Sequence, residues 1–240
     1  MWSGPRNIST AMMRSWGNRP DTIVSDEPLY AHYLEHIPVD HPGRAEIKAA
    51  HDTDWRSVVR ALTEVEIPGA SIFYQKHMAH HLLPDIDRGW LALVENCFLI
   101  RDPREMLASL NKKMGLPELR DTGLPQQVEI FRSIRDTTGR VPPVVDTSDV
   151  LSDPHRVLTL LCNAIGVSFE EAMLSWPAGP RETDGVWGKY WYDAVEKSTG
   201  FEPYVAKQVY LDPLLEDLAS ECRPFYEELH EHRLSPSVLP

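Results

Sequence analysis

Arginine and hydroxyl side chains are spaced for anion binding in the middle of the chain. Arg101 follows a short apolar run at residues 97–100, and Ser109 comes eight residues later. Pro103 suits the first turn of a helix, whose N-terminus offers free N–H groups and a partial positive charge. A strand, a sharp turn and a helix would therefore bring Arg101 and Ser109 to one phosphate-like anion.

A second segment of this kind opens the chain. A short strand end leads into a loop that contains Arg6, Ser9 and Thr10 and precedes a predicted helix. Arg6 supplies charge, the two hydroxyls supply hydrogen-bond donors, and the successive backbone amides are expected to form an anion-binding nest. The loop lacks the Gly-Lys-Ser/Thr ending of a Walker A loop, so it predicts a phosphate site of another kind.

Together the two segments resemble those of the sulfotransferase family that uses 3′-phosphoadenosine 5′-phosphosulfate (PAPS). In that family a loop Pro-Lys/Arg-x-x-Thr/Ser-Thr binds the 5′-phosphosulfate, and an Arg followed eight residues later by a Ser binds the 3′-phosphate. Residues 144–166 also resemble the family's late strand, acidic turn and helix, so the resemblance covers roughly residues 1–170. The two phosphate motifs fall on Pro5, Arg6, Ser9 and Thr10, and on Arg101 and Ser109.

The resemblance implies PAPS as donor, adenosine 3′,5′-bisphosphate (PAP) as product, and no metal. Arg6 takes the position of the family's catalytic cation, and Ile8 stands where a glycine is common, so its Cβ is expected to restrict φ. A basic, glycine-containing segment at residues 179–191 lies where family members often close over the cofactor. The residues predicted to bind the donor are Arg6, Asn7, Ile8, Ser9, Thr10, Arg101, Ser109, Arg181 and Lys189.

Two segments supply candidates for the base that takes a proton from the acceptor. Glu27, with Asp26 behind it, follows the second predicted strand, where one branch of the family has an acidic base. Lys76, His77 and His80 follow the third predicted strand, where another branch carries Lys-x-His, here with the spacing off by one. Both interpretations have structural alternatives, since Asp26 or Glu27 would also cap a helix and buried histidines are commonly structural. The predicted catalytic residues are therefore Arg6, Glu27, Lys76, His77 and His80.

Alternating strands and helices predict the α/β fold that would position these residues. Short apolar strands near residues 2–3, 22–24, 71–75, 97–100 and 142–145 are separated by helical patterns. This order predicts three layers, with a mostly parallel central sheet flanked by helices as in P-loop NTPases. Ligands of such sheets bind at the carboxyl ends of the strands, where both anion-binding segments would lie.

The chain is predicted to be one sulfotransferase-like domain over residues 1–240. The core sheet and helices occupy residues 1–170, and an aromatic-rich cover and C-terminal helix occupy residues 171–240. Residues 37–53 are expected to form a loop, and residues 205–232 a helix that is broken at its prolines. Because the chain starts almost on its first strand, the natural protein is expected to extend a few residues upstream.

The composition argues against several classes of partner. A net charge of −12 disfavours nucleic acid and polyanionic acceptors, which need basic surfaces. The three cysteines are too few for a disulfide scaffold, no apolar run is long enough to span a membrane, and no signal peptide is present. A cytoplasmic protein is therefore expected. His77, His80 and His81 have the spacing of metal ligands, but no cysteine or carboxylate obviously completes a site, so no metal is expected.

The leading interpretation is a PAPS-dependent sulfotransferase that moves a sulfuryl group, by in-line displacement, to a hydroxyl or amine of a small-molecule acceptor. The acidic surface and the aromatic C-terminal segment favour a neutral, cationic or aromatic acceptor. Two alternatives stay open: a nucleotide-dependent phosphotransferase, and a protein that binds PAPS, PAP or another nucleotide without sulfuryl transfer. Neither a membrane nor a nucleic acid is expected as a partner, and a homodimer stays open.

Overall fold

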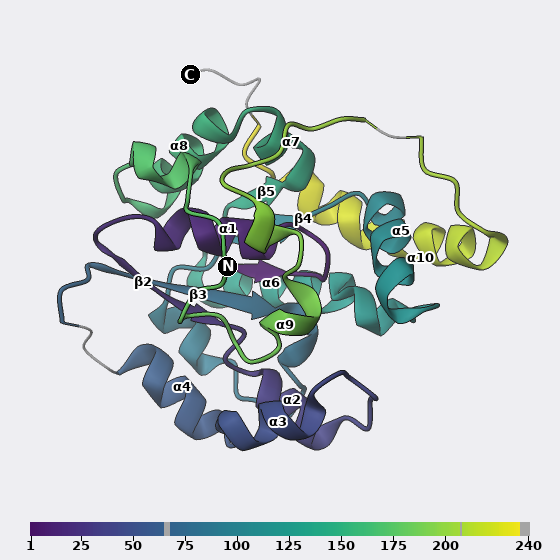
Figure 1. Cartoon of the computed structure of the whole chain (residues 1–240), viewed down its shortest axis with the longest axis horizontal. Helices are drawn as coiled ribbons and strands as arrows, with labels where there is room; N and C mark the ends of the chain where they lie inside the picture. Colours follow the sequence, from purple (N-terminus) through teal and green to yellow (C-terminus); the bar gives the residue numbers. More distant parts are fainter. Residues whose placement is uncertain (65–67, 207, 236–240) are drawn as a thin grey trace.

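Five parallel strands form the central sheet of the protein (Figure 1). The structure is a computed structural model that describes residues 1–64, 68–206 and 208–235. The strands stand in the order β2-β3-β1-β4-β5, and every neighbouring pair runs parallel. The predicted α/β fold with a parallel sheet flanked by helices is therefore confirmed. The strands are Trp2–Ser3 (β1), Thr22–Asp26 (β2), Ile72–Met78 (β3), Phe98–Ile100 (β4) and Val144–Asp146 (β5).

Helices connect the strands and surround the sheet. The helix predicted after Arg101 is present as α5, which begins at Pro103. Its N-cap is Asp102, whose carboxylate accepts a hydrogen bond of 2.9 Å from the backbone N–H of Arg104. The α-helices of the described ranges are Ser9–Gly17 (α1), Tyr30–His36 (α2), Arg44–Ala50 (α3), Trp55–Thr63 (α4), Pro103–Met114 (α5), Leu124–Thr138 (α6), Thr147–Ser152 (α7), Pro154–Ile165 (α8), Gly188–Trp191 (α9) and Pro213–Glu231 (α10).

The two faces of the sheet carry different helices because side chains alternate along each strand. On one face Tyr74 of β3 stacks on Trp16 of α1, with ring centroids 5.4 Å apart. On the other face Phe98 of β4 meets Phe131 of α6 edge to face, with centroids 5.6 Å apart. These buried aromatic pairs anchor α1 and α6 to opposite faces, so the sheet lies between two layers of helices.

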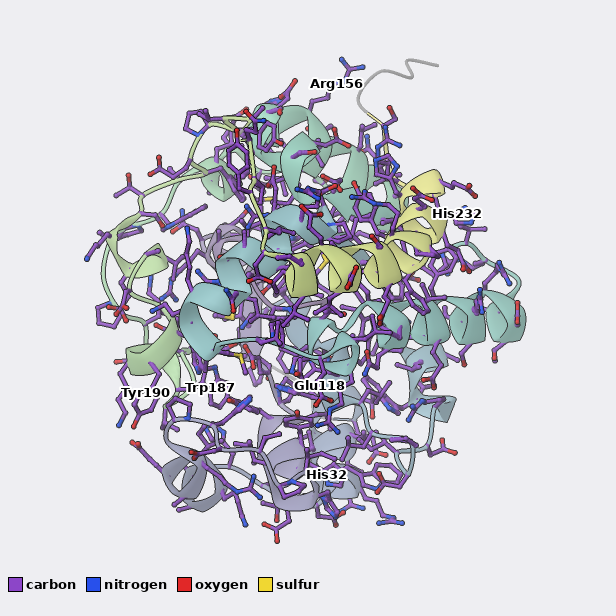
Figure 2. All side chains as sticks on the ribbon, turned by 90° about the vertical axis from the view of Figure 1, so that its right-hand side faces the viewer. His32, Glu118, Arg156, Trp187, Tyr190 and His232 are labelled. Atoms are coloured by element: carbon purple, nitrogen blue, oxygen red, sulfur yellow. The ribbon has the colours of Figure 1, made fainter. Side chains whose placement is uncertain are left out.

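Residues 176–204, here called the cover segment, pass over the sheet between α8 and the C-terminal helix. An ion pair ties this segment to α1, because Arg14 and Asp184 form two hydrogen bonds of 2.6 Å. Their side chains are only 2% and 8% exposed. In Figure 2, Trp187 and Tyr190 of the cover segment lie next to the layer of α2 and α3.

Two predicted segments differ in the structure. Residues 37–53, predicted as a loop, contain α3, which is held by the fully buried Ile47. The C-terminal helix α10 starts at Pro213 and continues through Pro224, where a break was predicted. Proline is favourable in a first turn and, in mid-helix, removes one backbone hydrogen bond. Packing of α10 against α5 and α6 keeps the helix intact despite that loss.

None of the helices within the described ranges combines the length and the apolar composition that crossing a membrane requires. Cys97, Cys162 and Cys222 are buried free thiols, in agreement with the expectation that the chain has no disulfide scaffold.

Removing the charge of Asp184 is predicted to destabilise the protein strongly. Asp184→Asn leaves Arg14 buried without a counter-charge, which is expected to lower the free energy of unfolding by about 3–5 kcal/mol. Urea denaturation followed by tryptophan fluorescence measures this change. The matched control is Glu228→Gln, which breaks the exposed Arg132–Glu228 pair and is expected to cost less than about 1 kcal/mol. Equal effects of the two variants would contradict a stabilising role for the buried pair.

Candidate active site

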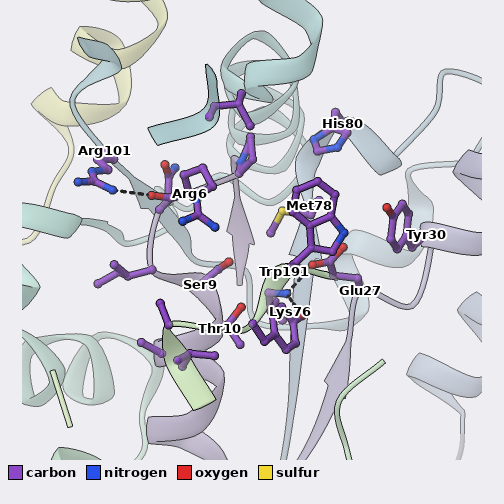
Figure 3. Close-up of a pocket in the computed structure, with 18 of the residues that line it drawn as sticks. Arg6, Ser9, Thr10, Glu27, Tyr30, Lys76, Met78, His80, Arg101 and Trp191 are labelled. Carbon is purple, nitrogen blue, oxygen red and sulfur yellow. Dashed lines mark hydrogen bonds and ion pairs between the residues drawn. The ribbon is translucent and has the colours of Figure 1, made fainter. Parts of the chain in front are cut away.

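A pocket with a volume of about 320 Å³ opens where the parallel strands end (Figure 3). Its wall includes residues that follow β1, β2, β3 and β4, together with residues of the cover segment. Strand β1 lies between β3 and β4, so the chain order reverses beside it, which is where open parallel sheets place their ligands. Figure 3 shows Arg6, Ser9 and Thr10 on one side of the pocket, and Glu27 and Tyr30 on the other.

The two predicted anion-binding segments meet at the first of these sides. The Nε atom of Arg6 donates a hydrogen bond of 3.0 Å to the hydroxyl of Ser109. Arg101 donates from Nη1 to the backbone carbonyl of Arg6 at 2.8 Å and forms an ion pair with Glu105 at 3.0 Å. Arg6 and Arg101 line the pocket, whereas Ser109 contacts Arg6 and is outside the pocket wall. Burial and the nearby Arg101 both lower the pKa of Arg6.

The loop after β1 adopts a strained backbone. In the described part of the chain, the non-glycine residues with positive φ are Arg6 (62°), Ile8 (58°) and Glu27 (41°), and all three line the pocket. A β-branched residue such as Ile8 rarely adopts this conformation, so its Cβ does not prevent the glycine-like backbone but adds strain to it. Strain of this kind concentrates at functional sites, where surrounding packing enforces it.

Helix α1 presents its N-terminus to the pocket. Ser9 and Thr10, its first residues, line the wall, and Ile8 provides no side-chain cap within the described structure. The first-turn N–H groups are therefore suited to an anionic ligand. Asn7 also lines the pocket, and its amide donates to the carbonyl of Leu99 at 3.3 Å, which joins the loop to β4.

Lys76 lies at the centre of a buried polar network on the other side of the pocket. Its ammonium donates to Asp26 at 2.8 Å, to Glu27 at 2.5 Å and to the hydroxyl of Tyr192 at 2.8 Å. These three bonds use all the N–H groups of the ammonium. Tyr192 in turn donates to Asp26 at 2.7 Å and accepts from the indole of Trp187 at 3.1 Å. The network therefore joins β2, β3 and the cover segment.

The network shifts the protonation of its members in opposite directions. Burial raises the pKa of the Glu27 carboxyl, and the neighbouring Asp26 adds to this increase, while Lys76 opposes it. Burial alone would lower the pKa of Lys76, but the carboxylates of Asp26 and Glu27 raise it well above its ordinary value. Lys76 therefore stays charged, and Glu27 is a carboxylate whose affinity for a proton is increased.

The structure separates the histidines that the sequence placed together. His77 is buried and stacked on Trp2 at 4.4 Å, so the structure does not bring this predicted base to the pocket. His80 and His81 line the pocket, and in the described structure the Nδ1 atoms of both have no hydrogen-bond partner. Burial lowers the pKa of His80 to about 3 and that of His81 well below its ordinary value, so both rings are neutral.

Two predicted donor-binding residues of the cover segment lie elsewhere. Arg181 donates to the carbonyl of Pro177 at 3.2 Å, and Lys189 pairs with Glu46 of α3 at 2.6 Å. Neither side chain lines the pocket, so the structure does not bring these two predicted residues to the other donor-binding candidates. The cover segment contributes Trp191 and Tyr192 to the pocket wall instead.

Sequence reasoning missed several residues of the pocket wall. Tyr30 and Tyr33 come from the helix that follows Glu27, and Asp121 comes from a short 3-10 helix, Leu119–Thr122 (η3). The aromatic cluster of the cover segment was a usable signal for Tyr192. No comparable signal marks Asp121, because its position depends on contacts between η3 and the short helix Ala79–His81 (η1). In the described ranges, no three side chains of the metal-binding types gather around one point.

The buried histidines predict a loss of stability on mild acidification. Their pKa is lowered in the folded protein, so the unfolded chain binds more protons once the pH falls below about 6.5. Each such histidine is expected to remove up to about 1.4 kcal/mol of unfolding free energy per pH unit. Urea denaturation between about pH 7 and pH 5 measures the slope. His81→Gln should make this slope of unfolding free energy against pH shallower by the contribution of one proton. The control His155→Gln, at an exposed position, should not change the slope. Equal slopes for the two variants would contradict the interpretation.

Comparison with known proteins agrees with the predicted fold and family. Branched-chain-amino-acid aminotransferase-like proteins 2 and 1 of Arabidopsis thaliana are 33% and 34% identical, over 100% and 99% of this chain. The chain spans only 43% and 42% of their lengths. The sulfotransferase domain from the curacin biosynthetic pathway has a TM-score of 0.57 at 15% identity, covering 92% of this chain and 95% of that domain, which shows a shared fold. The sequence model of the family described as "Sulfotransferase domain" matches residues 1–232, and the chain therefore belongs to this family.

Proposed function

We propose that the protein transfers a sulfuryl group from PAPS to a hydroxyl or amine of a small acceptor. The contact between Arg6 and Ser109 supports this proposal most directly, because it joins the loop after β1 to the segment after β4 at one pocket. The network of Lys76 and Glu27 lies on the opposite side of the same pocket. The arginines Arg6 and Arg101 and the candidate base Glu27 therefore line the same pocket.

The donor side fits an anion with two phosphate groups. Arg6, Ser9 and Thr10 would hold the 5′-phosphosulfate at the N-terminus of α1, and Arg101 with Ser109 would hold the 3′-phosphate. When bound, PAPS supplies an activated sulfuryl group. Two arginines and a helix N-terminus place positive charge where negative charge would collect on the leaving phosphate. Holding the donor at both ends supplies the positioning that such transfers require.

Glu27 is the best-placed base. Its Oε1 accepts from Lys76, while its Oε2 lies 3.9 Å from Nδ1 of His81, in the pocket wall. Burial raises the pKa of this carboxyl, which brings a general base closer to the pH at which it must accept a proton. Lys76 and Tyr192 position the carboxylate, and the neutral His80 and His81 offer unpartnered nitrogens to an acceptor hydroxyl.

Arg101→Ala is predicted to abolish most of the affinity for PAP. A charge-assisted hydrogen bond to phosphate is lost, so the dissociation constant measured by calorimetry should rise at least about tenfold. The control is Arg104→Ala in the helix α5 that follows Arg101, because Arg104 pairs with Glu216 outside the pocket. Unchanged PAP binding by Arg101→Ala, or preferential binding of ATP with Mg²⁺, would overturn the proposal and favour a phosphotransferase.

Glu27→Gln is predicted to remove catalysis without removing donor binding. Loss of a general base lowers kcat by about 10²–10⁴-fold, while the dissociation constant of PAP should stay unchanged. The rate is measured by mass spectrometry, as the formation over time of acceptor that carries one added sulfuryl group. His80→Gln is the comparison variant, and its kcat should fall by less than about tenfold. A larger loss of kcat in His80→Gln than in Glu27→Gln would assign the base to His80. If the unmodified protein binds PAP but forms no product, the result would favour a binding protein without sulfuryl transfer.

A further inference from the structure

The charges in the pocket wall are divided between its two sides. Positive charge lies on the donor side, at Arg6 and Arg101, whereas Lys76 is fully occupied by its three partners. On the opposite side Glu27 and Asp121 line the wall, and Glu202 of the cover segment is a further carboxylate of the pocket lining. Among the described residues that line this side, Lys76 is therefore the cation, and its donors are already used.

The network around Lys76 has an excess of negative charge. Its one ammonium faces two carboxylates, those of Asp26 and Glu27, and the side chains of Lys76 and Asp26 are each only 1% exposed. A cation in the acceptor would offset this excess in a poorly hydrated space, where charges interact more strongly than in water. An anionic acceptor would instead be repelled.

The histidines on this side do not contribute positive charge. Burial lowers the pKa of His41, His80 and His81, so their rings are neutral near pH 7. His81 is 2% exposed and lines the pocket, and among the described residues its Nδ1 has no hydrogen-bond partner. An unpartnered buried nitrogen in a pocket wall is suited to a polar group of a ligand.

Aromatic rings surround the same space. Tyr30, Tyr33 and Trp191 line it, and the hydroxyl of Tyr30 lies 2.7 Å from Nδ1 of His41. Rings of this kind attract cations through their negatively polarised faces. Figure 3 shows Trp191 between the donor side and Tyr30, so its indole borders the route from one side of the pocket to the other.

Asp121, like Glu202 of the cover segment, is a carboxylate of the wall that does not bind Lys76. Its Oδ2 accepts from the backbone N–H of Glu118 at 2.9 Å, and its Oδ1 lies 3.8 Å from Nε of Arg120. The side chain of Arg120 is 65% exposed, so this pairing is weak. Asp121 lines the pocket, and its charge adds to the effect of burial in raising the pKa of Tyr33, while Arg120 and Arg44, which are outside the pocket wall, oppose this increase.

We infer that the acceptor carries a cationic ammonium group as well as the hydroxyl that receives the sulfuryl group. This inference rests on the proposed function. The ammonium lies between Asp121 and the rings of Tyr33 and Trp191, and the hydroxyl faces Glu27. In the transfer, the acceptor oxygen forms a bond to sulfur, the bond from sulfur to the phosphate oxygen breaks with its electron pair on the phosphate, and the hydroxyl proton passes to Glu27.

Matched acceptors with and without a positive charge test this inference. Choline is compared with its uncharged carbon isostere dimethylbutanol, and tyramine with para-propylphenol and with anionic hydroxyphenylpropanoate. In every set that reacts with PAPS, kcat/KM for the cation should exceed that for the neutral partner at least about tenfold. Equal rates, or a preference for the neutral or anionic compound, would overturn the inference while the proposed function stands.

Asp121→Asn separates recognition of the cation from the reaction. The variant should lower kcat/KM for the cationic acceptor about tenfold and leave that for the neutral partner unchanged, because the amide oxygen can still accept from Glu118. The control is Glu118→Gln, which removes one charge from a side chain that is 70% exposed and outside the pocket wall. Equal losses for both acceptors would overturn the role of Asp121.

Binding measurements distinguish the remaining outcomes. One further outcome is that PAP binds while no acceptor set reacts. In that case, thermal-shift titrations of the PAP complex with choline, tyramine and their uncharged partners measure which compounds stabilise the protein. Preferential stabilisation by the cations supports the inference, and its absence overturns it. If PAP itself does not bind, the proposed function fails, and the inference fails with it.

Discussion

The ammonium group of Lys76, buried among two carboxylates and a phenol, is the interaction on which the candidate site depends. Its partners Asp26 and Glu27 stand at the end of β2, and Tyr192 belongs to the cover segment. One cation therefore joins two neighbouring strands to the segment that covers the pocket. Without it, two carboxylates would stay buried without a counter-charge, which typically costs about 3–5 kcal/mol.

Because of these contacts, much of the pocket is ordered before any ligand binds. The backbone N–H of Gly185 donates to Asp26 at 3.1 Å, and Asp184 binds Arg14 beside it, so the cover segment is attached to the core at adjacent buried points. Ile8 and Glu27, in the wall of the same pocket, have positive φ angles of 58° and 41°. A site that is already ordered avoids part of the entropic cost of binding and orienting two substrates.

Local patterns in the sequence predicted that Arg6, Arg101 and Ser109 lie together, as they do, whereas the opposite side of the pocket depends on contacts between distant segments. Arg101 and Ser109 belong to one strand, turn and helix, so their spacing alone indicates a shared anion. His77 was misplaced because the third strand was expected to end at residue 75. It continues to Met78, and alternation along it turns Lys76 toward the pocket and His77 to the opposite face. The role of Asp121 depends on the packing of η3 on η1, which no local pattern encodes.

The net charge of −12 is compatible with the proposed binding of an anionic donor because the two effects act over different distances. Charges exposed to solvent are screened within about 8–10 Å at physiological ionic strength, whereas Arg6 and Arg101 act at short range in a partly buried pocket. An anion is therefore favoured only where these arginines meet the N-terminus of α1. On the other side of the pocket the wall carries the carboxylates of Glu27 and Asp121, so the two proposed ligands would meet opposite charges.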